Sequence, residues 1–156
     1  MKIALGSDHA GFLYKEVLKE MLLGQGHEII DCGTDSLEAT NYPKYIIAAA
    51  EKVASGECER AIVLGGSGNG EAIAANKVYG IRCALAWNEE TARLSRAHNN
   101  ANVLALGERM ISQETAQRIV ILWLQTSFES GRHERRLEEL ASYEQEHSRD
   151  IITNKN

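Results

Sequence analysis

The stretch RAIVLGGSGNGE, residues 60–71, sets the fold class, because an aliphatic run ends abruptly in a glycine-rich loop and an acidic residue. The segment at 60–64 has the uninterrupted apolar character of a strand that is buried on both faces. Four glycines within the next six residues free the backbone for positive φ and for close approach of a ligand. A strand, a glycine turn and a helix in this order are typical of an α/β protein with a parallel sheet.

The same alternation extends along the chain in both directions. In the first expected helix, Leu13, Val17 and Met21 are spaced four apart and predict its buried face. We expect strands over 2–6, 27–31, 60–64, 82–87 and 103–106, and helices over 12–23, 42–54, 71–77, 89–97, 113–125 and 132–147. The pattern therefore predicts five parallel strands in one sheet, with helices on both faces and a final C-terminal helix.

Length and hydropathy predict one domain in an aqueous compartment. The chain has 156 residues, enough for one sizeable core and too few for two. We expect a single domain over 1–147 and a polar C-terminal tail over 148–156. No apolar run approaches the roughly 18 residues of a membrane span, and the opening MKIALGSDHAG lacks the apolar stretch of a signal peptide. We therefore expect a cytoplasmic protein with no membrane partner.

The charge balance argues against nucleic acid as a partner. Lys and Arg total 17 against 22 Asp and Glu, which gives a net charge of -5, whereas affinity for nucleic acid comes largely from neutralising phosphates. A nucleic-acid module built on RHERR at 132–136 is therefore the weakest alternative.

The cysteines offer no framework for disulfides or zinc. Cys32, Cys58 and Cys83 are odd in number, widely spaced and without a CxxC. We expect all three to be buried or half-buried thiols.

The loop at 65–70 predicts an anion site. Successive N–H groups there, with the start of the next helix, form a cradle for negative charge; the alternative is a tight turn that requires small residues. The spacing is not GxGxxG, and no Lys-Ser/Thr pair follows as in a P-loop. Glu71 follows instead, which suits removal of a proton next to a carbonyl while the amides stabilise the enediolate oxygen. Taken alone, Glu71 would be a first-turn acid favoured by the helix dipole.

Further polar groups stand at the ends of the predicted elements. Asp8 and His9 follow the first strand, where the alternative is a helix cap, and Arg109 follows the fifth. Ligands bind at the carboxyl ends of parallel strands, so these residues are candidates for the same site. His98 closes the fourth helix, where the alternative is a side chain that complements the helix C-terminus.

The final helix begins with a pair of arginines. Arg132 and Arg136 are four apart and share one face, whereas we expect His133 and Arg135 to point elsewhere. Two arginines near a helix start oppose its dipole unless an anion or a partner lies there. The pair suits a phosphate dianion, and the alternative is a solvated basic patch.

Several motifs together resemble one known family. SDHAG at 7–11, GGSGNGEAIAANKV at 65–78, HNNANVLALGERM at 98–110 and GRHERRLEEL at 131–140 occur in the order found in ribose-5-phosphate isomerase type B, a family that includes the galactose-6-phosphate isomerase subunits. The resemblance covers roughly residues 1–147. It implies a three-layer Rossmann-like sandwich, no cofactor and no metal. It also implies a homodimer, sometimes paired into tetramers, with active sites at the subunit interface.

The resemblance also implies roles for individual residues. The expected catalytic residues are Glu71, Ser67, Asp8 and His98. Asp8 and His98 would assist opening of the furanose ring, with His98 supplied by the neighbouring subunit, and Ser67 would move protons between substrate oxygens. The expected substrate-binding residues are His9, Arg109, Arg132 and Arg136 for the phosphate, Asn99 for the sugar hydroxyls, and the backbone of Gly66, Gly68, Asn69 and Gly70 for the oxyanion.

The base departs from the common pattern of the family. Many members carry a cysteine at the position of Gly65, whereas a subset with GGSGNGE uses the glutamate, which is Glu71 here. We predict an aldose–ketose isomerase that interconverts ribose 5-phosphate and ribulose 5-phosphate through a cis-enediolate, with Glu71 as the base. Two alternatives remain open: an isomerase of a tetrose 4-phosphate or hexose 6-phosphate, and a non-catalytic sugar-phosphate-binding protein.

Overall fold

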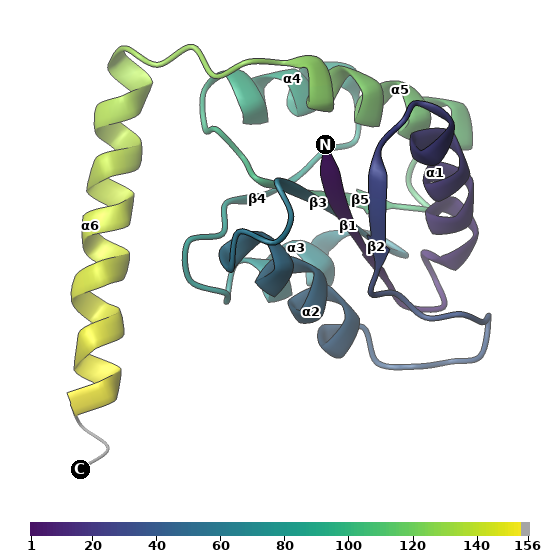
Figure 1. The fold of residues 1–156 in the computed structure, drawn as a ribbon, viewed down its shortest axis with the longest axis horizontal. Coiled ribbons are helices and arrows are strands. Elements are labelled where there is room, and N and C mark those ends of the chain that lie inside the picture. Colours follow the sequence, from purple (N-terminus) through teal and green to yellow (C-terminus); the bar gives the residue numbers. More distant parts are fainter. Residues whose placement is uncertain (154–156) are drawn as a thin grey trace.

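Five parallel strands form one sheet in the order β2-β1-β3-β5-β4 (Figure 1). The strands are β1 Lys2–Ser7, β2 Glu28–Asp31, β3 Arg60–Gly65, β4 Cys83–Leu85 and β5 Val103–Gly107. The helices are α1 Phe12–Gly24, α2 Pro43–Ala54, α3 Asn69–Ala75, α4 Glu89–Ala97, α5 Gln113–Gln125 and α6 Arg132–Thr153. This computed structural model describes the backbone of residues 1–153 and the side chains of residues 1–148.

Helices cover both faces of the sheet, as predicted. α1, α4 and α5 lie on one face, and α2 and α3 lie on the other (Figure 1). Successive residues of β3 point to opposite faces, so Ile62 packs with α1 and α5 while Val63 packs with α2. All residues of β5, and all but the first of β3, are buried, which explains their uniformly apolar sequences. The three-layer Rossmann-like α/β prediction is confirmed.

The buried face of α1 differs from the predicted one. Leu18, Leu22 and Lys15 are buried, whereas Leu13, from the predicted face, is 52% exposed. The Lys15 ammonium lies 2.6 Å from the carboxylate of Asp31, at the end of β2. Apolar spacing missed this face because a lysine buries its aliphatic stem while its charged end meets a partner.

The helix α6 stands beside the sheet and belongs to neither layer (Figure 1). It continues to Thr153, through the first part of the predicted tail over 148–156, and residues 154–156 lie outside the described residues. Its Glu144 carboxylate accepts hydrogen bonds from the amide of Gly80 at 3.1 and 3.2 Å. Within the described part of the chain, no helix has both the length and the apolar character needed to cross a membrane.

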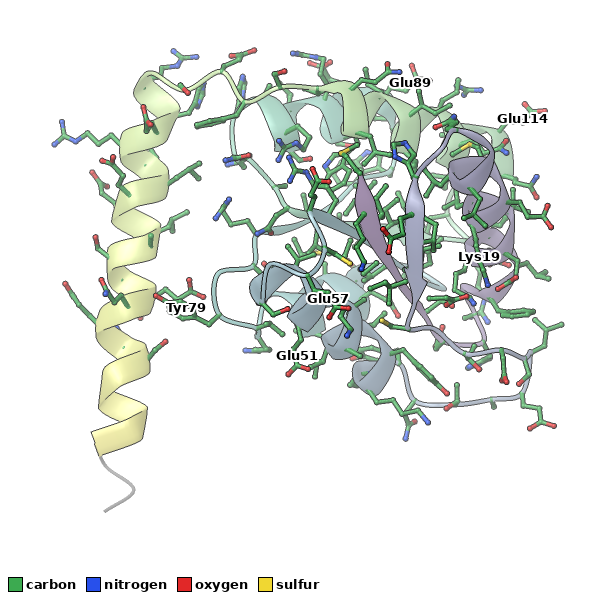
Figure 2. All side chains as sticks on the ribbon, in the orientation of Figure 1. Lys19, Glu51, Glu57, Tyr79, Glu89 and Glu114 are labelled. Atoms are coloured by element: carbon green, nitrogen blue, oxygen red, sulfur yellow. The ribbon has the colours of Figure 1, made fainter. Side chains whose placement is uncertain are left out.

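A groove of about 970 Å³ separates α6 from the segment around β4. Tyr79 lies in the space between that segment and α6 (Figure 2). Leu140 and Tyr143 of α6 also line the groove, and they are 60% and 64% exposed. Large apolar side chains on both walls therefore face solvent in the single chain.

All five strands run in the same direction, so their carboxyl ends lie on one side of the sheet and their amino ends on the opposite side. We call these two sides the carboxyl edge and the amino edge. The loops after β1, β3 and β5 lie at the carboxyl edge, and the ends of β3 and β5 are aligned there, with Gly65 opposite Gly107. The end of α4 and the start of α6 lie at the amino edge, where the amide of Glu129 donates to the carbonyl of Ala97 at 2.9 Å. A five-residue strand such as β5 separates these edges by about 16 Å.

Candidate active site

The Glu71 side chain is buried against the last residue of β3. Glu71 lies in the first turn of α3 and is 4% exposed. A Cβ at Gly65 would lie 1.9 Å from its Oε1 and 2.2 Å from its Cδ. Only a glycine at position 65 leaves room for this carboxyl, so the two residues fit as a pair.

The environment of Glu71 makes it a stronger base than an exposed glutamate. Burial raises the pKa of the Glu71 carboxyl, and the neighbouring Asp8 carboxylate also raises it, against backbone hydrogen bonds at Glu71 and Gly68 that lower it. A general base works best with a pKa near the working pH. The shift is therefore in the direction that proton abstraction requires.

The glycine loop is held to the end of β5. The carbonyls of Gly65 and Gly66 accept hydrogen bonds from the amides of Glu108 and Arg109 at 2.9 and 3.0 Å. Because a trans peptide directs its C=O and N–H oppositely, the amides of residues 66 and 67 point away from β5. Gly68 has a φ of 82°, and a Cβ there would lie 2.5 Å from Leu85 Cδ1. These contacts with the end of β5 and with Leu85 therefore determine the conformation of the loop.

Polar side chains of the loop remain accessible at its rim. Ser67 and Asn69 are exposed, and both the backbone N and Nδ2 of Asn69 lie 3.3 Å from Ser67 Oγ. A Cβ at Gly70 would lie 2.8 Å from the ring of Tyr42. Tyr42 thus packs against the back of the loop, while the Ser67 hydroxyl lies at the exposed rim with its oxygen accepting from Asn69.

Asp8 and His9 lie at the same edge, directly after β1. Asp8 is 7% exposed, and its Oδ1 accepts a hydrogen bond from the amide of Ala10 at 3.0 Å. The His9 Nδ1 accepts one from the amide of Thr40 at 3.2 Å. Asp8 thus forms a local turn and places a carboxylate near Glu71, whereas the N-cap position of α1 is Gly11 and not Asp8.

Arg109 lies at the carboxyl edge, directly after Glu108, whose carboxylate binds the start of α1. A Cβ at Gly66 would lie 3.2 Å from Arg109 Nη1, so the guanidinium lies over the glycine loop. Glu108 accepts a hydrogen bond from the amide of Tyr14 at 3.1 Å and so caps α1, for which Gly11 supplies no side chain. No sequence pattern indicated Glu108, because its partner Tyr14 is distant along the chain.

The amino edge carries a second group of predicted site residues. His98 stacks on His133, with ring centroids 4.2 Å apart and an interplanar angle of 10°. His98 Nε2 also lies 3.5 Å from the Glu129 carboxylate. As expected, His133 points away from the exposed face of Arg132 and Arg136, and its side chain is only 7% exposed. Burial lowers the pKa of His133, and the charges of His98, Arg132 and Arg136 lower it further.

The His98, Glu129 and His133 side chains place three potential metal ligands within 4.8 Å of one another. However, Arg132 Nε lies 3.5 Å from His133 Nε2, and a guanidinium beside a ligand atom repels a cation. The two stacked rings also lie in nearly parallel planes, so their in-plane lone pairs do not converge on one point. The cluster suits an anionic ligand beside the arginines better than a metal ion.

One chain brings the predicted residues together in two groups, not one. The carboxyl edge holds Asp8, His9, Gly66, Ser67, Gly68, Asn69, Gly70, Glu71 and Arg109, and the amino edge holds His98, Asn99, Arg132 and Arg136. Asn99 is exposed, as are both arginines. Because the sheet lies between them, neither group reaches the other within a single chain.

The chain matches a known family over most of its length. The model of the family described as Ribose/Galactose Isomerase matches residues 3–140. The chain belongs to this family. Ribose-5-phosphate isomerase B of Mycolicibacterium paratuberculosis is 49% identical over 149 residues, covering 94% of each chain. D-erythrulose-4-phosphate isomerase 2 of Mycolicibacterium smegmatis is 43% identical over 132 residues, 83% of this chain and 87% of that one.

Solved structures of family members agree with the fold. Ribose-5-phosphate isomerase B of Clostridium thermocellum has a TM-score of 0.92 and 46% identity, covering 94% of this chain and 99% of that one. The enzyme of Mycoplasma genitalium with bound ribulose-5-phosphate has a TM-score of 0.89 and 37% identity, covering 93% and 97%. The resemblance drawn from the motifs is thereby confirmed.

Proposed function

We propose that this family member interconverts ribose 5-phosphate and ribulose 5-phosphate, with Glu71 as the base. The observation that carries the proposal is the Glu71 carboxyl, buried against Gly65 beside a loop of fixed amides. The names of its relatives support the substrate. A phosphate-bearing sugar also suits the histidine and arginine side chains at both edges, because guanidinium groups bind phosphate as charged donors.

In the proposed reaction Glu71 moves one proton between two carbons. The carboxylate takes the proton from C2 of the open-chain aldose and returns it to C1, through a cis-enediolate. The amides of residues 66–70 stabilise the oxyanion as its charge develops. The Ser67 hydroxyl, exposed at the rim, carries the accompanying proton from O2 to O1, so that no proton is gained or lost overall.

A second copy of the chain completes the site in this proposal. His98 and Asn99 would meet the sugar ring, and Arg132 and Arg136 would join His9 and Arg109 around the phosphate. The separation of the two groups within one chain favours this assembly. The groove beside α6 also favours it, because Leu140 and Tyr143 expose apolar surface that a partner would cover.

A tetrose 4-phosphate is the second candidate substrate. The relative from Mycolicibacterium smegmatis that is named for D-erythrulose 4-phosphate is 43% identical, and both substrates need the same proton transfer. A comparison of kcat/KM for four-, five- and six-carbon sugar phosphates separates them. We expect the five-carbon substrate to give the highest value, and a higher value for a tetrose phosphate would overturn that part of the proposal.

Glu71→Gln tests the base directly. We expect kcat to fall by about 10²–10⁴-fold, the usual contribution of a general base, with KM close to that of the wild type. Glu114→Gln is the matched control, since Glu114 is also a first-turn glutamate but is exposed (Figure 2). Near-normal turnover by Glu71→Gln would remove Glu71 from the mechanism. Absence of turnover by the wild type would support the non-catalytic alternative.

Mixing two inactive variants tests the shared site. Glu71→Gln disables the carboxyl edge and His98→Asn disables the amino edge. In a dimer mixed from equal amounts, half of the molecules are hybrids, and each hybrid has one intact site of two. We therefore expect about a quarter of wild-type activity to return. No recovery after confirmed subunit exchange would contradict a site built from both chains.

A further inference from the structure

The turn after α4 carries two predicted site residues in a constrained conformation. His98 and Asn99 open this turn, and Asn100 follows with a φ of 45°. A non-glycine residue with positive φ is uncommon, although asparagine tolerates it better than most. Such a turn persists only where its surroundings hold it in place.

Arg82, directly before β4, binds two backbone carbonyls of the turn. Its Nε donates a hydrogen bond to the carbonyl of Asn99 at 3.1 Å, and its Nη2 donates to the carbonyl of Asn100 at 2.9 Å. The amide of Arg82 donates to Asn102 Oδ1 at 2.8 Å. One guanidinium thus spans two consecutive carbonyls, which a single ammonium does not reproduce.

Arg96, near the end of α4, binds the last part of the turn. Its Nη1 donates to Asn100 Oδ1 at 2.9 Å and to the carbonyl of Ala101 at 2.5 Å. Arg96 is 4% exposed, and its guanidinium lies 5.8 Å from the ring centroid of Trp123. The indole N–H of Trp123 in turn donates to Ser95 Oγ at 3.1 Å. Arg96 is therefore held between the turn and the buried Trp123.

Both arginines donate hydrogen bonds to the turn, and neither donates to a carboxylate among the described side chains. Among the side chains that the structure describes, neither lies within 4.0 Å of an acidic group. Burial lowers the pKa of Arg82, and burial with the nearby charges of Arg60 and Arg82 lowers the pKa of Arg96 to about 10. Arg96 therefore remains protonated at neutral pH. Burying its charge without an acidic partner opposes stability, which favours a role for this donor beyond packing.

We propose that Arg82 and Arg96 are positioning residues for ring opening: together they hold the turn so that His98 and Asn99 meet the sugar. This inference rests on the proposed function, in which His98 assists opening of the furanose. A displacement of about 1 Å in a positioned group lowers turnover by about 100-fold. The two guanidiniums act through the backbone that carries His98, and neither needs to touch the substrate.

The chemistry of the two sugars separates positioning of His98 from general damage. Ribose 5-phosphate closes to a furanose through O4, so the enzyme must open it. Ribulose 5-phosphate has its O5 blocked by phosphate and is an open chain. Exchange of its C1 proton with D2O needs Glu71 but no ring opening. A variant with a misplaced His98 should lose aldose turnover and keep this exchange.

Arg82→Lys is the test, because lysine keeps the positive charge but cannot bind the carbonyls of Asn99 and Asn100 through two separate nitrogens. We expect kcat on ribose 5-phosphate to fall by about 10-fold or more, with KM changed less than about threefold and with C1 exchange within about twofold of the wild type. His98→Asn should give the same pattern with a larger loss. Arg60→Lys is the matched control, since Arg60 is half-buried at the start of β3 and donates to the carbonyl of Glu59.

Four outcomes would overturn the inference. Equal losses in both reactions for Arg82→Lys, or dissociation of its dimer in light scattering, would make Arg82 structural only. Unchanged aldose turnover in Arg82→Lys, with a selective loss in His98→Asn, would overturn the inference and leave the proposed function standing. No selective loss in His98→Asn would overturn the role of His98, and the inference with it.

Discussion

The carboxyl and amino edges of the sheet are built in different ways. At the carboxyl edge the backbone does the positioning: Gly65, Gly66 and Gly68 allow close approach of neighbouring groups, and the key carboxyl of Glu71 is buried. At the amino edge charged side chains do it, and Arg132 and Arg136 are exposed. The first edge is organised within one chain, while the second presents its arginines outward, as the proposed site shared between two chains requires.

Gly65→Ala should break the carboxyl edge most severely. The added Cβ would lie 1.9 Å from Glu71 Oε1, so the carboxyl must leave its position. We expect kcat to fall by about 10²–10³-fold, close to the loss of the base itself. Gly24→Ala is the control, because a Cβ there meets nothing within 4 Å. Steady-state kinetics of both variants checks this, and near-wild-type turnover by Gly65→Ala would show that the carboxyl position is not critical.

Arg136→Ala should sharpen the contrast by affecting binding. A charge-assisted contact to phosphate contributes about 1.5–3 kcal/mol, so we expect KM to rise by about 10–100-fold. Arg135→Ala is the matched control one residue away, since the Arg135 side chain is 85% exposed and lies near Glu139. Equal effects in both variants would indicate a diffuse basic field in place of a phosphate contact.

The pH dependence of stability tests the burial of Glu71 independently of catalysis. Its pKa is raised in the folded state, so the stability that its protonated form contributes is present below the ordinary pKa of about 4.5 and is lost as pH rises through the raised value. Glu71→Gln is neutral throughout. We expect it to melt higher than the wild type at pH 8, by about 2–4 °C for each kcal/mol.

The control for this measurement is the acid range itself. Below the ordinary pKa both the wild type and Glu71→Gln carry a neutral side chain, so their melting temperatures should converge. A difference that persists unchanged from pH 8 to pH 4 would mean that the amide stabilises the fold by packing and that ionisation of Glu71 is not responsible.

Much of the fold was predictable because the central strands are uniform. The aliphatic runs of β3 and β5 are buried on both faces, and the density of glycines before Glu71 indicated a site. The stacking of His133 on His98 was not predicted, and the reason lies in the backbone before α6. The residues before α6, Ser130 and Gly131, have φ values of 57° and 59°. This left-handed turn sets the direction of α6, and helical periodicity carries no information on it.

The close fit of Gly65 and Glu71 also constrains how the family can diversify. A side chain at position 65, such as the cysteine that the resemblance implies for many members, would occupy the volume that the carboxyl fills here. A substitution at position 65 alone would displace the Glu71 carboxyl. We therefore expect positions 65 and 71 to change together among relatives, so that lineages with one type of base descend separately from lineages with the other.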